Sequence, residues 1–228
     1  MKTLNMIKTN LLAALIALIS IPTFVSCLGN DEPGQTGREV TALVTFEGNY
    51  DSRARFTFVP EGDAETKSYI ADKALPDDLV RGQRMIIRFV ELGTVSNGYI
   101  TSISLRAYNT IPTSSVKIVD TETAVAANAE IYVNAINRTG KFINLEAYVK
   151  NYPERDYTIY ADENTVNNEM PDLYITTTTN GDYTGIKNTD IASFDISMVW
   201  SRIDCKGVRI HINNTNTAPT KKVFEFKK

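Results

Sequence analysis

The stretch 39–47 reads Glu-Val-Thr-Ala-Leu-Val-Thr-Phe-Glu, and it sets the pattern for the whole chain. Apolar side chains recur there at every second position. They are Val40, Ala42, Val44 and Phe46. A period of two is typical of a β-strand that buries one face and exposes the other. This stretch is therefore predicted to be a half-buried strand.

Similar stretches on the C-terminal side extend the pattern to five strands. They are predicted at 40–47, 53–58, 67–70, 83–92 and 101–107. A short helical turn is expected within 71–80, where Pro76 limits its length. Five strands with an insert after the third fit a small OB-like β-barrel over residues 39–115. A plain five-stranded meander is the alternative.

A second domain is predicted over residues 125–228, after a boundary region at 112–125 that lacks a strong period. Seven strands are expected at 130–137, 141–150, 156–161, 173–179, 193–201, 206–213 and 222–227. Trp200 falls in phase with Phe194 and Ile196 and is predicted to be a core residue. Seven short strands in about 100 residues are typical of an immunoglobulin-like β-sandwich. The predicted fold class is all-β.

The N-terminal 26 residues have the layout of a secretory signal peptide. A basic start is followed by an apolar run at 11–25, and Ser26 precedes Cys27. The apolar run is too short to be a transmembrane helix, because fifteen helical residues rise only about 22 Å and the hydrocarbon core is about 30 Å thick. A cysteine after the cleavage site predicts a lipidated Cys27. An ordinary signal with a structural thiol is the alternative.

The lipid predicts a cell-envelope location, in an outer membrane lipoprotein that faces either the periplasm or the cell surface. Residues 27–38 contain glycine, proline and charge without an apolar period, which is typical of a flexible tether. Asp31 and Glu32 in this tether resemble the acidic surface-export signal of some Gram-negative lipoproteins.

Charge and cysteine content argue against a nucleic-acid partner and against a disulfide. Removal of the signal takes away two of the 24 basic residues and none of the 27 acidic ones, which leaves a net charge of −5. Nucleic-acid binding calls for a basic patch, so no nucleic-acid partner is expected. Cys205 has no partner once Cys27 is lipidated, and we expect it to be a buried small hydrophobe rather than a reactive thiol.

Catalytic residues are not assigned. His211 is the only histidine, and its position between Ile210 and Ile212 predicts a surface or strand-edge residue. Serine and cysteine hydrolases need a base beside the nucleophile, and no Gly-x-Ser-x-Gly stretch marks such a nucleophile. Two loop carboxylates could still act as a glycosidase pair, although nothing selects one pair.

Metals and cofactors are not predicted either. One histidine and one free cysteine do not make a transition-metal site, and no phosphate-binding glycine motif occurs. Calcium needs only oxygen ligands, so the densest oxygen cluster leaves calcium open, with a solvated loop as the expected state. Its members are Asp162, Glu163, Asn164, Asn167, Asn168, Glu169 and Asp172. Glu61, Asp63 and Glu65 are expected to form an ordinary solvated turn.

A binding surface is predicted on the second and third strands of the barrel, the usual ligand face of OB folds. Arg53 and Arg55 are expected to point outward there, with Tyr50 in the preceding loop and Tyr69 nearby. Arginines beside tyrosines suit an anionic sugar or a peptide. A solvated strand face is the alternative.

The chain resembles the NigD-like lipoproteins of Bacteroidetes in several stretches. They are Ser26-Cys27 with its acidic linker, 79–87 (LVRGQRMII), Leu92-Gly93, 131–134 (IYVN), 139–145 (TGKFINL) and 193–197 (SFDIS). The resemblance implies an OB-like N-terminal domain and a C-terminal β-sandwich. It brings no catalytic signature.

These observations together predict a non-enzymatic binding or interaction module, anchored in the membrane by lipid. Its partner would be an envelope protein or a glycan. A carbohydrate-active hydrolase that uses loop carboxylates and a structural assembly subunit are the alternatives.

Overall fold

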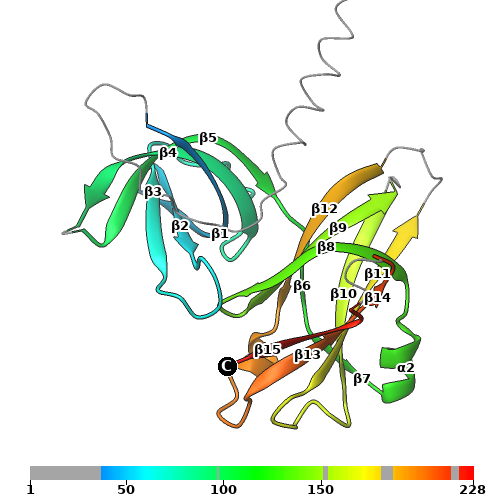
Figure 1. Cartoon of the computed structure of the whole chain (residues 1–228). Helices are drawn as coiled ribbons and strands as arrows, with labels where there is room; N and C mark the ends of the chain where they lie inside the picture. The colour runs from blue at the N-terminus through cyan, green and yellow to red at the C-terminus, as the bar shows by residue number, and fades with distance from the viewer. Residues whose placement is uncertain (1–36, 97, 151–153, 181–186, 217–220) are drawn as a thin grey trace, which may run out of the picture. The chain divides into compact units, whose positions relative to one another are not determined.

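The computed structural model describes residues 37–96, 98–150, 154–180, 187–216 and 221–228 (Figure 1). Residues 37–228 belong to one compact unit. The predicted signal peptide and most of the tether, including Cys27, lie outside the described residues, so the structure does not test lipidation.

The N-terminal half is a closed five-stranded barrel with the order β1-β2-β3-β5-β4. The strands are β1 (Glu39–Tyr50), β2 (Arg53–Phe58), β3 (Lys67–Ala71), β4 (Arg84–Val95) and β5 (Ile100–Thr110). β3 and β5 pair in parallel and the other neighbours are antiparallel, which excludes a simple meander. The predicted OB-like barrel is confirmed.

Alternation along the strands builds the barrel core. Phe46 and Phe56 are almost fully buried, and their ring centroids lie 5.8 Å apart. The turn between β1 and β2 consists of Asp51 and Ser52, both with positive φ, as the tight two-residue hairpin turns require. This end of the barrel therefore carries a short turn instead of a long loop.

The helical turn predicted within 71–80 is wrong, because the described chain forms bends and turns there. Leu75 enters the barrel core instead and is only 4% exposed. Asn49 of β1 fixes this loop, since its side chain donates to Leu75 O (2.8 Å) and accepts from Leu75 N (3.0 Å). One asparagine side chain thus holds Leu75 in place in a loop whose backbone forms no helix.

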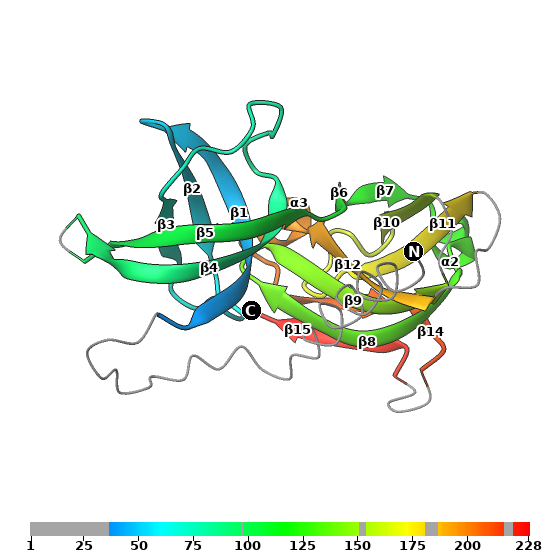
Figure 2. The same ribbon diagram turned by 90° about the horizontal axis from the view of Figure 1, so that it is seen from above.

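The C-terminal half is a sandwich of two five-stranded sheets. One has the order β15-β13-β11-β10-β7 and the other β14-β8-β9-β12-β6. The bounds are β6 (Thr113–Ser115), β7 (Lys117–Val119), β8 (Glu130–Thr139), β9 (Phe142–Lys150), β10 (Glu154–Asp162), β11 (Asp172–Asn180), β12 (Lys187–Asp195), β13 (Gly207–His211), β14 (Asn213–Asn214) and β15 (Val223–Lys227). Figure 2 follows the chain from β5 of the barrel through β6 and β7 into this sandwich.

The barrel followed by a sandwich confirms the predicted all-β fold class. The strand count differs from the predicted seven because those seven did not include three short strands, β6, β7 and β14. Each of these pairs in parallel, with β12, β10 and β8 respectively, and β11 also pairs in parallel with β13. The sheets are therefore mixed, whereas an immunoglobulin sandwich is antiparallel.

The strand predicted at 193–201 ends early. Asp195 Oδ1 accepts a hydrogen bond from Ser197 N (2.8 Å), and the helical turn α3 (Ser197–Trp200) follows. Trp200 is buried as predicted, but Met198 is 47% exposed, which the alternation did not predict. The other helix, α2 (Thr121–Ala126), begins after Asp120, whose side chain caps it at Thr123 N.

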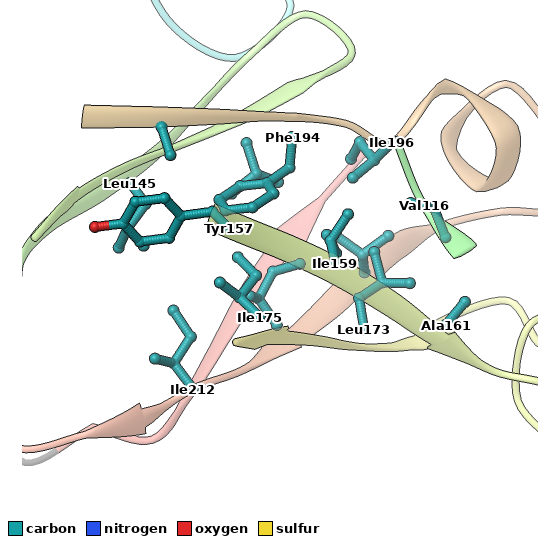
Figure 3. Close-up of a cluster of buried hydrophobic side chains, with 14 of the residues drawn as sticks. Val116, Leu145, Tyr157, Ile159, Ala161, Leu173, Ile175, Phe194, Ile196 and Ile212 are labelled. Atoms are coloured by element: carbon teal, nitrogen blue, oxygen red, sulfur yellow. The ribbon is translucent and has the colours of Figure 1, made fainter. Parts of the chain in front are cut away.

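The sandwich core lies between the two sheets (Figure 3). Leu145 of β9 and Phe194 of β12 meet Ile159, Leu173 and Ile175 of the facing sheet, all at most 1% exposed. Full burial of one such side chain contributes about 1.5–3 kcal/mol. None of the helices among the described residues has the length and apolar character of a membrane span.

The outer edge of β8 is covered by side chains where its partner strand β14 has ended. Asn214 Oδ1 accepts from Val133 N (3.1 Å), and Asn216 Nδ2 donates to Val133 O (2.8 Å). Further along, Gly62 of the barrel donates its N–H to Arg138 O (2.7 Å). Two side-chain amides and one loop thus satisfy backbone groups that a neighbouring strand would otherwise bind.

We expect Asn214→Ala to lower the free energy of unfolding by about 1–3 kcal/mol, because a buried N–H of Val133 loses its acceptor. Urea unfolding followed by circular dichroism measures the change. The matched control is Asn128→Ala at an exposed position, which should stay within about 0.5 kcal/mol of the wild type. Equal stability of the two variants would contradict this account of the β8 edge.

Candidate functional site

Arg84 joins the barrel to the sandwich. It begins β4, and because Met85 points into the barrel, Arg84 points outward, yet it is only 3% exposed. Its guanidinium donates to oxygens on four strands. They are Thr45 Oγ1 (3.0 Å) of β1, Thr139 Oγ1 (3.3 Å) of β8, Asn144 Oδ1 (3.3 Å) of β9 and Ser193 Oγ (3.4 Å) of β12. All four acceptors are uncharged.

Burial lowers the pKa of Arg84 to about 10, although the negative charge of Asp195 opposes the shift. The side chain is therefore still a cation at neutral pH. The ring of Phe142 lies 4.5 Å below the guanidinium carbon and supplies a cation–π contact. Among the acceptors, Ser193 Oγ donates to Asn144 Oδ1 (2.7 Å) and Asn144 Nδ2 donates to Thr139 Oγ1 (2.9 Å). The cation thus sits in a connected polar network.

A second arginine ties the loop between β2 and β3 to the sandwich. Arg138, 6% exposed, binds both carboxylate oxygens of Asp63 at 2.7 Å. Its guanidinium carbon lies 4.1 Å above the ring of Trp200. The hydrogen bond from Arg138 lowers the pKa of Asp63. Asp63 lies in an exposed turn, as expected, but its carboxylate also makes a contact with the sandwich that was not expected.

A groove opens beside this joint, with a cavity volume of about 570 Å³. Its lining comes from both halves of the described chain. The residues are Thr45, Glu47, Thr57, Val59, Thr66, Arg81, Gly82, Arg84, Thr139, Gly140, Lys141, Phe142 and Asp195. A second hollow shares Arg81, Gly82, Phe142 and Asp195 and continues along 110–113. We take this junction groove as the candidate site because it contains the buried Arg84 together with side chains of both halves.

Two ion pairs fix the charges of the junction groove. Arg81 Nε lies 3.3 Å from Glu47 Oε2, and Lys141 Nζ lies 2.9 Å from Asp195 Oδ2. Burial raises the pKa of Asp195, but hydrogen bonds from Ser197 and Lys141 outweigh it and hold that pKa below its ordinary value. Asp195 is therefore a carboxylate at neutral pH. The groove offers threonine hydroxyls and two closed ion pairs, and its one unpaired charge, Arg84, is buried, which suits a polar, uncharged ligand.

The predicted binding face is only partly assembled. Tyr50 is 40% exposed, and the guanidinium carbon of Arg55 lies 4.6 Å from its ring centroid. Arg53 is exposed directly opposite Tyr50 in the register. Tyr69 is not on this face, because it pairs with the inward-facing Phe56 and is 4% exposed. Burial raises the pKa of Tyr69 to about 12.

His211 lies on an inner strand, since β13 runs between β11 and β15. Its Nε2 lies 2.7 Å from Asp172 Oδ1, and its ring stacks on Tyr174 at 4.5 Å. Arg209 binds both oxygens of Asp172, at 2.6 and 2.7 Å. This hydrogen bonding, first of all from Arg209, lowers the pKa of Asp172. The cluster satisfies itself internally and lies on the solvent face of the sheet.

The oxygen-rich loop at 162–172 is also held by protein donors. Asp162 Oδ1 accepts from Thr121 Oγ1 (2.6 Å) and from Asn164 N (3.0 Å), and Asp172 is bound to Arg209. Within the described ranges, no three histidine, cysteine, aspartate or glutamate side chains converge as metal ligands. Cys205 is 3% exposed, as predicted.

Comparison with known proteins identifies solved structures with a similar fold. No family model and no curated protein matches the chain. A solved "protein of unknown function DUF1344" from Bacteroides vulgatus matches with a TM-score of 0.66 at 15% identity, over 84% of this chain and 91% of that one. A NigD-like immunity protein from Bacteroides caccae matches with a TM-score of 0.55 at 15% identity, over 82% and 91%.

A third solved structure is named a "Putative lipoprotein" from Bacteroides fragilis. It matches with a TM-score of 0.56 at 14% identity, over 83% of this chain and 98% of that one. The resemblance to NigD-like proteins and lipoproteins of Bacteroidetes is therefore confirmed as a likeness of fold.

We expect Arg84→Ala to lower the free energy of unfolding by about 2–4 kcal/mol, because a cavity forms and a buried polar network loses its donor. Arg84→Lys keeps the charge without the planar fork, so its loss should be about half as large. Urea unfolding measures both. Arg106→Ala, at an exposed position in β5, is the matched control and should change stability by less than about 0.5 kcal/mol. An Arg84→Ala protein as stable as this control would show that the network does not hold the joint.

Proposed function

We propose that this protein is a non-enzymatic binding module of the bacterial cell envelope, anchored in the outer membrane by lipid on Cys27. The Ser26-Cys27 sequence after an apolar signal and the glycine-rich tether support the anchor. The fold likeness to a protein named as a lipoprotein agrees with an envelope location. Stable anchoring needs two or more acyl chains, which such a cysteine would carry.

The junction groove carries the binding proposal. Its two walls belong to the barrel and to the sandwich, and Arg84 fixes them with bonds to β1, β8, β9 and β12. A preorganised groove loses little entropy when a ligand binds. Because its ion pairs balance and threonines line it, the ligand we propose is an uncharged, hydroxyl-rich segment, that is, a glycan.

Hydrolysis by the same groove is less well supported. A glycosidase needs one carboxylic acid with a raised pKa, as proton donor, beside a second carboxylate. Asp195 has a lowered pKa and is bound to Lys141, and Glu47 is bound to Arg81 and to Thr57. Both carboxylates therefore act as acceptors that hold the groove together. A structural assembly subunit would need a protein partner, which the crosslinking below detects.

Mass spectrometry of the mature N-terminus is expected to show an acylated Cys27 as the first residue. Cys27→Ser should abolish acylation and release the protein from the membrane fraction, because the tether carries no other anchor of this kind. The control is Ser52→Ala, in the exposed turn of the barrel, which should leave acylation unchanged. A mature chain that starts at Leu28 or keeps Met1 would refute the anchor.

Photo-crosslinking in intact cells tests the groove. A photoreactive amino acid at Thr66, exposed at the groove, should give an adduct, whereas the same group at the fully exposed Ile203 should not. A loss of adduct mass on glycosidase digestion identifies a glycan adduct, and peptides of a second protein found in the adduct by mass spectrometry identify a protein adduct. Peptides of a second protein would favour an assembly subunit over glycan binding. The same adducts from both positions would show that the groove selects nothing.

A further inference from the structure

The far half of the β4–β5 hairpin exposes large apolar side chains. Leu92 is 61% exposed, Val95 40% and Tyr99 83%. In the near half of β4, by contrast, Met85, Ile87 and Phe89 point into the core and are fully buried. Exposed apolar groups gathered in one element mark an interaction surface more often than chance. We call Leu92, Val95 and Tyr99 the hairpin tip residues.

The hairpin tip residues lie where the tether enters the fold. Glu39 pairs with Val90, and Gly37 lies directly beside Val90 and the carbonyl of Glu91. Leu92 is the next residue along β4. In Figures 1 and 2 the dark blue start of β1 and the far end of the β4–β5 hairpin lie at the same end of the barrel.

The length of the tether limits the distance from this end to the membrane. Nine residues separate Cys27 from Gly37, and a fully extended chain spans at most about 3.5 Å per residue. A lipid on Cys27 therefore keeps the entry point within about 35 Å of the bilayer surface. Because β1 is antiparallel to β4, the chain before Glu39 continues past Val90 toward Leu92 and the hairpin tip. From Val90, Leu92 lies two residue steps away, about 7 Å, and Arg84 lies six steps away in the other direction, about 20 Å at about 3.3 Å per step. Leu92 is thus nearer than the junction groove to the point where the tether enters.

The chemistry of the tip favours a lipid interface. Residues 92–105 contain no charged side chain, so the tip itself brings no ion into the headgroup layer, and the exposed Glu91 lies just before it. Tyrosine is enriched at this depth, because its ring is apolar and its hydroxyl can stay hydrated. Attachment through the tether alone does not set the orientation of the barrel, whereas a second contact beside the tether would fix it.

We propose that Leu92, Val95 and Tyr99 insert into the interfacial layer of the membrane that holds the lipid anchor, and so orient the barrel with the junction groove away from the bilayer. This proposal rests on the proposed lipidation of Cys27. It assigns the hairpin tip a lipid partner, and the three side chains act together with the acyl chains.

Fluorescence quenching tests the insertion in the full lipidated protein. The protein is reconstituted into phosphatidylcholine vesicles, with or without brominated acyl chains. Trp200 is buried and gives the background of the wild type, which is subtracted. The added signal of Tyr99→Trp should be quenched at least about twofold by brominated lipid, as for an interfacial aromatic group. The matched control, Ile203→Trp on the sandwich, should be nearly unaffected.

Flotation of the vesicles separates failure of this proposal from failure of the anchor. A wild-type protein that does not float with the vesicles overturns the lipid anchor, and the hairpin proposal with it. Flotation with a Tyr99→Trp signal quenched no more than the Ile203→Trp signal overturns the hairpin proposal alone. A triple variant, Leu92→Ser, Val95→Ser and Tyr99→Ser, should still float. It should lose the slowing of amide exchange in β4 and β5 that vesicles produce in the wild type, and unchanged slowing would also overturn insertion.

Discussion

A buried guanidinium without an acidic partner determines how this protein is put together. Arg84 is 3% exposed, and moving a cation out of water costs several kcal/mol unless every donor finds an acceptor. Its acceptors come from one barrel strand and three sandwich strands, so the cost is offset only when both halves are in place. A purely apolar joint would tolerate sliding, because apolar contact has no direction. The hydrogen bonds of Arg84 are directional, so they fix the positions of the strands that form the walls of the groove.

The second arginine at the same joint, Arg138, is stabilised by an ion pair and an aromatic ring instead of by uncharged acceptors. Arg138 has a carboxylate partner, Asp63, and an aromatic one, Trp200, so its charge is matched directly. Arg84 fixes the strands and Arg138 fixes the loop between β2 and β3. The two contacts leave the outer ion pairs, Glu47 with Arg81 and Lys141 with Asp195, free to face the groove. The buried network thus fixes the joint, whereas the ion pairs beside it stay partly exposed.

Much of the fold could be predicted because the barrel strands alternate strongly and are long enough to show a period. The failures have local causes. β6, β7 and β14 are two or three residues long, so they show no period at all. Tyr69 lies in a strand where Ile70 is also buried, and alternation could not decide which of the two faces inward. Arg84 resembled an ordinary polar start of a strand. Its burial depends on Asn144 and Ser193, which are 60 and 109 positions away, and no local pattern reports such contacts.

The covered edge of β8 has a consequence for the proposed attachment of this protein to a membrane surface. An open strand edge binds any other open strand edge, and confinement to two dimensions raises the frequency with which identical copies meet side by side. The side-chain amides of Asn214 and Asn216 bind the backbone N–H and C=O of Val133. A side chain, unlike a strand, cannot pair with a further strand on its other side. Neighbouring copies therefore find no template for a continuous sheet at this position. At this position the two amides therefore work against edge-to-edge pairing of one copy with another.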